Sequence, residues 1–114
     1  MIYNKRKEGF ILAIKVKKFN DNLRGVCLNL PNKEKVLKDR LIMDSVILLE
    51  YVYMANFSKD SRDKMVILTK ISMIDYYLEI FYKNKYFGEK VLYNLSSSLE
   101  EISKMVYGWV LNGS

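Results

Sequence analysis

Histidine is absent from this chain of 114 residues, which contains one cysteine, one proline and five glycines. Without histidine the commonest general acid–base residue is missing, and so are Ser-His, Cys-His and His-metal arrangements. The single Cys27 has no partner for an internal disulfide and no second thiol with which to hold a metal. These absences exclude most catalytic templates. We therefore expect a protein without enzymatic activity or cofactor, in a reducing cytoplasm.

Long hydrophobic runs are also missing. The apolar run over residues 9–14 is shorter than the core of a secretion signal, which needs roughly 7–15 residues. In LIMDSVILLEYVYMA, Asp44 and Glu50 interrupt the apolar stretch well below the roughly 20 residues that cross a bilayer. No membrane partner is expected.

The scarcity of glycine and proline favours long helices with short connections. In four segments apolar residues recur mostly in steps of three and four, which places each set on one face of a helix. We predict an all-α fold, an antiparallel four-helix bundle in up-down-up-down order, formed by residues 1–114 as one domain with a short N-terminal arm over about residues 1–11. The four sets are Leu12, Val16, Phe19, Leu23, Val26 and Leu30; Leu37, Leu41, Leu48, Tyr51 and Ala55; Ile67, Ile71, Ile74, Leu78 and Phe81; and Leu92, Leu95, Leu99, Ile102, Val106 and Trp109.

Helix boundaries follow from the polar breaks. Pro31 disfavours helix at the residue before it, and Asn32 is expected to cap a second helix over about residues 33–55. Ser58 or Ser61 is expected to begin the third. The second helix is apolar on a wide face, which predicts burial on more than one side and hence a homo-oligomer.

Positive charge is concentrated in the first third of the chain. Through Arg40, eleven Lys/Arg stand against four Asp/Glu, whereas from Leu41 onward eight face nine. Such an excess suits an anionic partner, and rows of cations bind phosphates without reading sequence. Plain solubilising charge is the alternative. The predicted cations for RNA or DNA are Lys15, Lys18, Arg24, Lys35, Lys38 and Arg40.

Two further groups of residues allow other functions. Asp75 and Glu79 are spaced i,i+4, so both carboxylates share a helix face and resemble half of a metal site. A solvated face or an ion pair is the simpler reading, because a third ligand is not evident. Tyr76 and Tyr77 suit subunit contacts or packing better than stacking on bases.

The closing segment EEISKMVYGWVLNGS contains the only tryptophan. Gly108 has no side chain, so we expect another backbone to approach closely at that turn, while Trp109 covers the end of the core. A frayed last turn is the alternative.

LEEISKMVYGWV, over residues 99–110, resembles the final helix of the accessory variability determinant (Avd) family. NLPNKEKVLKDRL is similar to the corner between the family's first two helices, and DYYLEIFYKNKYFGEKVLYNLSSSLEE to its connection between the third and fourth. The resemblance extends over about residues 16–111. One departure concerns Asp75 and Glu79, which stand where third helices of the family often have basic residues.

The resemblance implies a homopentameric accessory protein without chemistry of its own. Such proteins bind a reverse transcriptase and template nucleic acid in a diversity-generating retroelement. A sibling family, the four-helix proteins encoded in ribosomal RNA intervening sequences, has a similar bundle, so an orphan structural or protein-interaction module stays open as the alternative.

Overall fold

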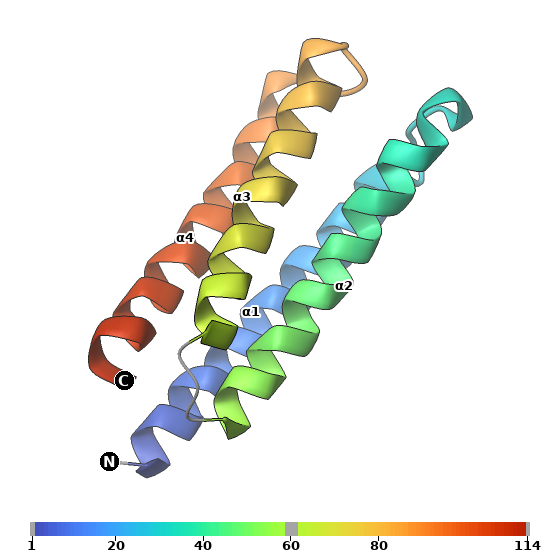
Figure 1. Ribbon diagram of the computed structural model, residues 1–114. Helices are drawn as coiled ribbons and strands as arrows, with labels where there is room; N and C mark the ends of the chain where they lie inside the picture. Colours follow the sequence, from blue (N-terminus) through green and yellow to red (C-terminus); the bar gives the residue numbers. More distant parts are fainter. Residues whose placement is uncertain (1, 59–61, 114) are drawn as a thin grey trace.

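The computed structural model describes the backbone of residues 2–58 and 62–113, and the side chains of residues 10–58 and 62–109. Over these ranges the chain forms helices α1 (Ile2–Cys27), α2 (Lys35–Phe57), α3 (Arg62–Lys83) and α4 (Glu89–Gly113), with the 3-10 turn η1 (Asn32–Glu34) before α2. Successive helices run in opposite directions, so α1 begins and α4 ends at the end opposite the α1–α2 and α3–α4 connections (Figure 1). The predicted all-α four-helix bundle is confirmed.

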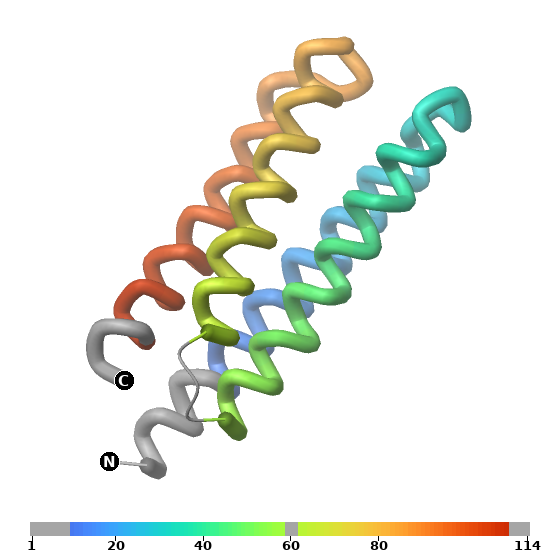
Figure 2. Tube along the Cα trace, in the orientation of Figure 1, coloured from blue at the N-terminus to red at the C-terminus, as the bar shows by residue number. Residues whose placement is uncertain are grey.

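Each helix packs beside two others: α1 and α3 both contact α2 and α4, and so lie diagonally across the bundle. The trace in Figure 2 shows the resulting pair of hairpins, and the rod measures 47 × 24 × 18 Å. Aliphatic and aromatic side chains from all four helices share one core, because the three-and-four spacing places them on the inner faces. The largest fully buried ones are Phe19, Phe81, Leu12, Leu23, Leu41, Leu48, Ile67, Ile74, Leu78, Leu99, Ile102 and Val16.

The beginning of the chain differs from the prediction. Helix α1 starts at Ile2, so the segment expected to be an N-terminal arm is the first part of this helix. The first helix ends at Cys27, ahead of Pro31, because proline disfavours helix in the residue before it. Asn32 does not cap α2. Asn32 is instead the first residue of η1. The N-cap of α2 is Glu34, whose side chain makes no capping hydrogen bond.

Helix α2 extends slightly beyond its predicted end at about residue 55. Helix α2 continues to Phe57, and Ser58 follows as its C-terminal cap, donating its backbone N–H to the carbonyl of Met54 at 2.8 Å. Ser58 is therefore the C-terminal cap of α2, and its expected role at the start of α3 stays a prediction, because residues 59–61 lie outside the described range. The alternative cap, Ser61, lies outside the described residues.

Helix α3 ends in a Schellman motif. Lys85 adopts a left-handed conformation with φ of 63°, the position where glycine is usual. The N–H of Tyr86 donates to the carbonyl of Phe81 at 3.0 Å, and that of Lys85 to the carbonyl of Tyr82 at 2.9 Å. The rings of Phe81 and Tyr86 meet edge to face with centroids 5.8 Å apart. This contact offsets the unfavourable backbone of Lys85 and fixes the turn into α4.

Helix α2 packs against both α1 and α3, but some of its large apolar side chains stay exposed within the described chain. Exposed apolar side chains remain on α1 and α2, and we refer to five of them as the outer apolar surface: Phe10, Ile14, Met43, Met54 and Phe57.

Candidate nucleic-acid interface

A groove of about 420 Å³ lies between the first turns of α2 and the second half of α3. Lys33, Lys35 and Arg40 line it, and all three are exposed. The buried ring of Tyr77 reaches it from α3. The positive end of the α2 dipole lies at the same place, which adds to the attraction for an anion. We call this feature the α2–α3 groove.

One carboxylate partly offsets these charges. Glu34 also lines the groove and accepts a hydrogen bond from the hydroxyl of Tyr86 at 3.3 Å. The Nζ of Lys33 lies 5.6 Å from the centroid of the same tyrosine ring, a cation–π distance. These contacts join η1 to the α3–α4 connection and hold Lys33 at the mouth of the groove.

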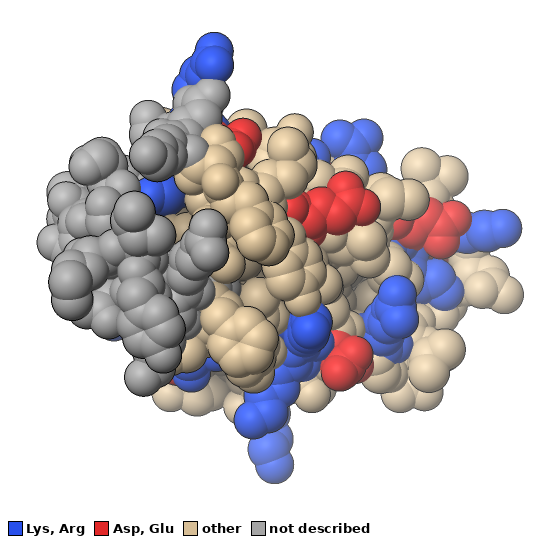
Figure 3. All heavy atoms as spheres, turned by 90° about the horizontal axis from the view of Figure 1, so that it is seen from below, with Lys and Arg blue, Asp and Glu red and all other residues tan. Residues whose placement is uncertain are grey.

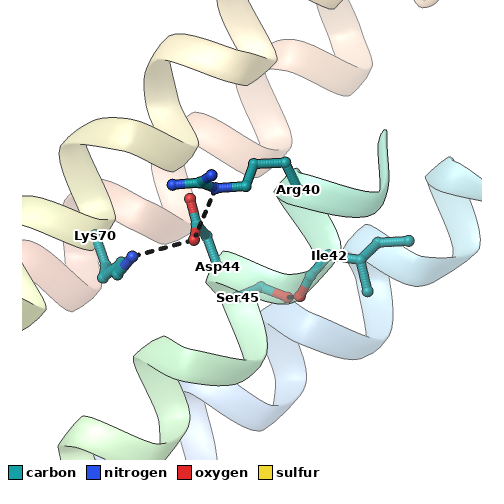
Figure 4. Close-up of polar contacts among 5 residues, drawn as sticks. All are labelled: Arg40, Ile42, Asp44, Ser45 and Lys70. Carbon is teal, nitrogen blue, oxygen red and sulfur yellow. Dashed lines mark hydrogen bonds and ion pairs between the residues drawn. The ribbon is translucent and has the colours of Figure 1, made fainter. Parts of the chain in front are cut away.

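Further along α2 than the groove, the buried carboxylate of Asp44 joins α2 to α3 (Figure 4). Asp44 is 1% exposed, and its Oδ1 accepts a hydrogen bond from the Nζ of Lys70 at 3.2 Å. The Nε of Arg40, whose side chain is 61% exposed, lies 3.6 Å from the same oxygen. Asp44 Oδ2 has no partner among the described atoms. The carboxylate thus anchors Arg40, so that this guanidinium is positioned beside the groove while its other donors face water.

Lys38 points toward α1 instead. Its Nζ donates to the carbonyl of Leu30 at 3.3 Å and so closes the corner between the first two helices.

Burial raises the pKa of the Cys27 thiol to about 11, although the nearby charge of Lys38 acts in the opposite direction. The thiol is therefore protonated at neutral pH, which makes Cys27 a core residue and a poor nucleophile.

The remaining predicted cations lie on α1. Lys15 pairs with Glu101 of α4, and the hydrogen bond from Lys15 holds the pKa of that carboxyl below its usual range, with a smaller contribution from Lys18. Lys18 and Arg24 are exposed.

The six predicted cations therefore do not form one surface. The structure brings Lys35 and Arg40 together in the α2–α3 groove, whereas Lys15 and Lys38 make contacts within the chain. Seen from below in Figure 3, basic and acidic side chains are interspersed over the visible described surface. In the α2–α3 groove, exposed cations and a binding volume coincide.

The predicted packing residues have different environments. Tyr76 is 54% exposed on the outside of α3, whereas Tyr77 is buried. Trp109 lies in the core, where the Nζ of Lys64 stands 4.7 Å from its ring centroid and donates to its carbonyl at 3.4 Å. No other part of the described chain approaches Gly108 closely, because a Cβ there would meet nothing within 4 Å.

Asp75 and Glu79, the two carboxylates considered for a metal site, lie in different surroundings. Glu79 forms an ion pair with Lys83 at 2.9 Å, and this hydrogen bond raises the pKa of the lysine. Asp75 lines a shallow hollow between α3 and α4 together with Glu100. In the part of the chain that the structure describes, no third cysteine, histidine or carboxylate joins such a pair.

Sequence reasoning missed Lys33, Asp44 and Lys70. The i,i+4 spacing of Arg40 and Asp44 is visible in the sequence and signals an ion pair on one helix. The contribution of Lys70 depends on the register of α3 against α2, which no local spacing shows.

Comparisons with known proteins leave the family open, since neither a protein-family model nor a curated protein sequence matches the chain. None of the helices, over their described residues, combines the length and hydropathy needed to cross a membrane.

Proposed function

We propose that this bundle is a non-enzymatic accessory protein of the cytoplasm that holds single-stranded RNA or DNA for a reverse transcriptase in a diversity-generating retroelement. The observation that supports nucleic-acid binding is the α2–α3 groove, where Lys33, Lys35 and Arg40 are exposed around one volume of about 420 Å³. The role beside a reverse transcriptase rests on the resemblance of residues 16–111 to the Avd family.

The groove suits the phosphate backbone better than it suits bases. Two flexible ammonium groups and a guanidinium held by Asp44 offer charge and several donors to phosphate oxygens. Tyr77, the aromatic residue that lines the groove, is buried, and the nearby ring of Tyr86 has the ammonium group of Lys33 at 5.6 Å from its centroid. Stacking on an open aromatic face is therefore not available at this place, and binding through the groove should be independent of sequence.

Binding to single-stranded RNA tests the proposal. Fluorescence anisotropy with a labelled oligonucleotide should show association at about 50 mM salt and a steep loss of affinity by about 200 mM, because phosphate binding releases counterions. An absence of binding at low salt, or an affinity that does not change with salt, would contradict the proposal.

We further propose that the protein is a homo-oligomer, a pentamer according to the resemblance. The outer apolar surface supports self-association, since Phe10, Phe57 and their neighbours remain exposed in the single chain. Light scattering at micromolar concentration should give a mass that is a multiple of 13.5 kDa. A monomeric mass would rule out self-association under these conditions.

The second candidate is a structural or protein-interaction bundle without nucleic-acid binding. Two contacts favour it: the ion pair of Lys15 with Glu101 and the hydrogen bond from Lys38 to the Leu30 carbonyl. In both, a lysine that was predicted to bind phosphate contacts another part of the chain. Such a bundle would share the oligomeric mass but not the salt-dependent binding of RNA, so the two measurements together separate the candidates.

A further inference from the structure

A second cleft, of about 670 Å³, lies between the second half of α1 and the first half of α4. Its polar lining contains the carboxamides of Asn22, Asn29 and Asn94 and the carboxylate of Asp21. All four side chains are exposed, and none makes a hydrogen bond or ion pair with another described residue. The cleft thus presents donors and acceptors whose bonding capacity is not used within the described chain.

Gly25 lies in the wall of this cleft. A Cβ at this position would meet nothing within 4 Å, so no neighbouring atom of the described chain requires a glycine. Alanine would also stabilise the helix relative to glycine. The missing side chain instead leaves the cleft open on the α1 side, where a ligand can approach the helix backbone closely.

The apolar part of the lining suits the face of a ring. Apolar side chains of Val26, Val91 and Leu95 form part of the walls and provide contact for a ring face. Below the cleft, the ion pair of Lys15 with Glu101 bridges α1 and α4. The pair crosses the seam between the two helices, and we take the occupant of the cleft to be a single ring, which needs no path along that seam.

We propose, resting on the nucleic-acid binding proposed above, that this cleft receives one unpaired adenine base of the bound strand. A carboxamide pairs with adenine through two hydrogen bonds, donating to N7 and accepting from the 6-amino group. The Asp21 carboxylate is an acceptor and not a donor, so it favours a base with an exocyclic amino group and disfavours the keto oxygens of uracil. Lys18, one helical turn before Asn22, is exposed and can contact a flanking phosphate.

The test compares two oligonucleotides of about 15 residues, oligoadenylate and the same strand with purine riboside, which lacks only the 6-amino group, in place of adenosine. Fluorescence anisotropy at about 50 mM salt should show about tenfold tighter binding of the adenine strand. The double variant Asn22→Ala/Asn94→Ala should remove this preference and leave the salt-dependent binding of both strands in place.

Gly25→Leu provides an independent check, because the added side chain has room in the helix and fills the cleft. It should fold, with an unchanged or higher urea midpoint, and bind both strands equally. Thr69→Leu, which places the same side chain at an exposed position of α3, is the matched control. It should retain the preference of about tenfold for the adenine strand.

Equal binding of the two strands by the unaltered protein, with a steep salt dependence, would overturn this inference and leave the proposed function in place. Failure of both strands to bind at low salt would overturn both. If Gly25→Leu lowers the oligomeric mass and leaves the adenine preference intact, the cleft holds a protein segment and the inference is wrong.

Discussion

Asp44→Ala should lower the free energy of unfolding by about 3 kcal/mol, because it removes the acceptor of a partly buried ammonium group. Lys70 is 22% exposed and donates to Asp44 at 3.2 Å, so in the variant its charge would stay near the α2–α3 interface without a partner. Arg40 is more exposed and can turn toward water. Urea unfolding followed by circular dichroism measures the difference.

The cost arises from the unpaired charge and not from the loss of an attractive pair. The double variant Asp44→Val/Lys70→Met removes both charges and fills the space with apolar groups. It should therefore unfold within about 1 kcal/mol of the unaltered protein. A double variant as unstable as Asp44→Ala would show that the ion pair itself stabilises the interface.

Lys33→Glu/Lys35→Glu should weaken binding of single-stranded RNA about 100-fold at about 50 mM salt, because two phosphate contacts become repulsive. Both side chains are exposed, Lys33 in η1 and Lys35 as the first residue of α2, where acidic residues interact favourably with the helix dipole, so the fold should be retained. Fluorescence anisotropy gives the affinity, and circular dichroism confirms the helix content.

Lys85→Glu/Lys90→Glu is the control for net charge. These lysines are exposed at the α3–α4 connection and do not line the α2–α3 groove, and the variant changes the total charge by the same amount. It should lose only a few-fold in affinity, through the weaker long-range field. Equal losses in both variants would mean that the groove has no special role.

Much of the fold could be predicted because the signal is local. Leu12, Val16, Phe19 and Leu23 recur at helical spacing and are all buried, and the same holds for Ile67, Ile71, Ile74 and Leu78. The errors lie at the helix ends. Asn32 has the side chain of a cap but lies in a 3-10 turn, and α2 extends to Phe57, beyond its predicted end at about residue 55. End positions depend on tertiary packing, which overrides capping preference.

The candidate site was less predictable, because its geometry depends on contacts between residues distant in sequence. A lysine row on the sequence does not show that Lys15 pairs with Glu101 or that Lys38 bonds the Leu30 carbonyl. The ion pair of Arg40 with Asp44 is a partial exception, because the i,i+4 spacing of the two residues is visible in the sequence. The grouping of Lys33, Lys35 and Arg40 opposite Tyr77 required the packed α2 and α3.

Binding of a strand in the α2–α3 groove is tested most directly by the slope of log affinity against log salt concentration. The measurement compares the unaltered protein with Lys33→Gln/Lys35→Gln, which removes two charges without adding any. Single strands contribute about 0.7 to the slope per phosphate contact, so the variant should be shallower by about 1.4. An identical slope in the two proteins would show that these lysines do not contact phosphates and would contradict the account.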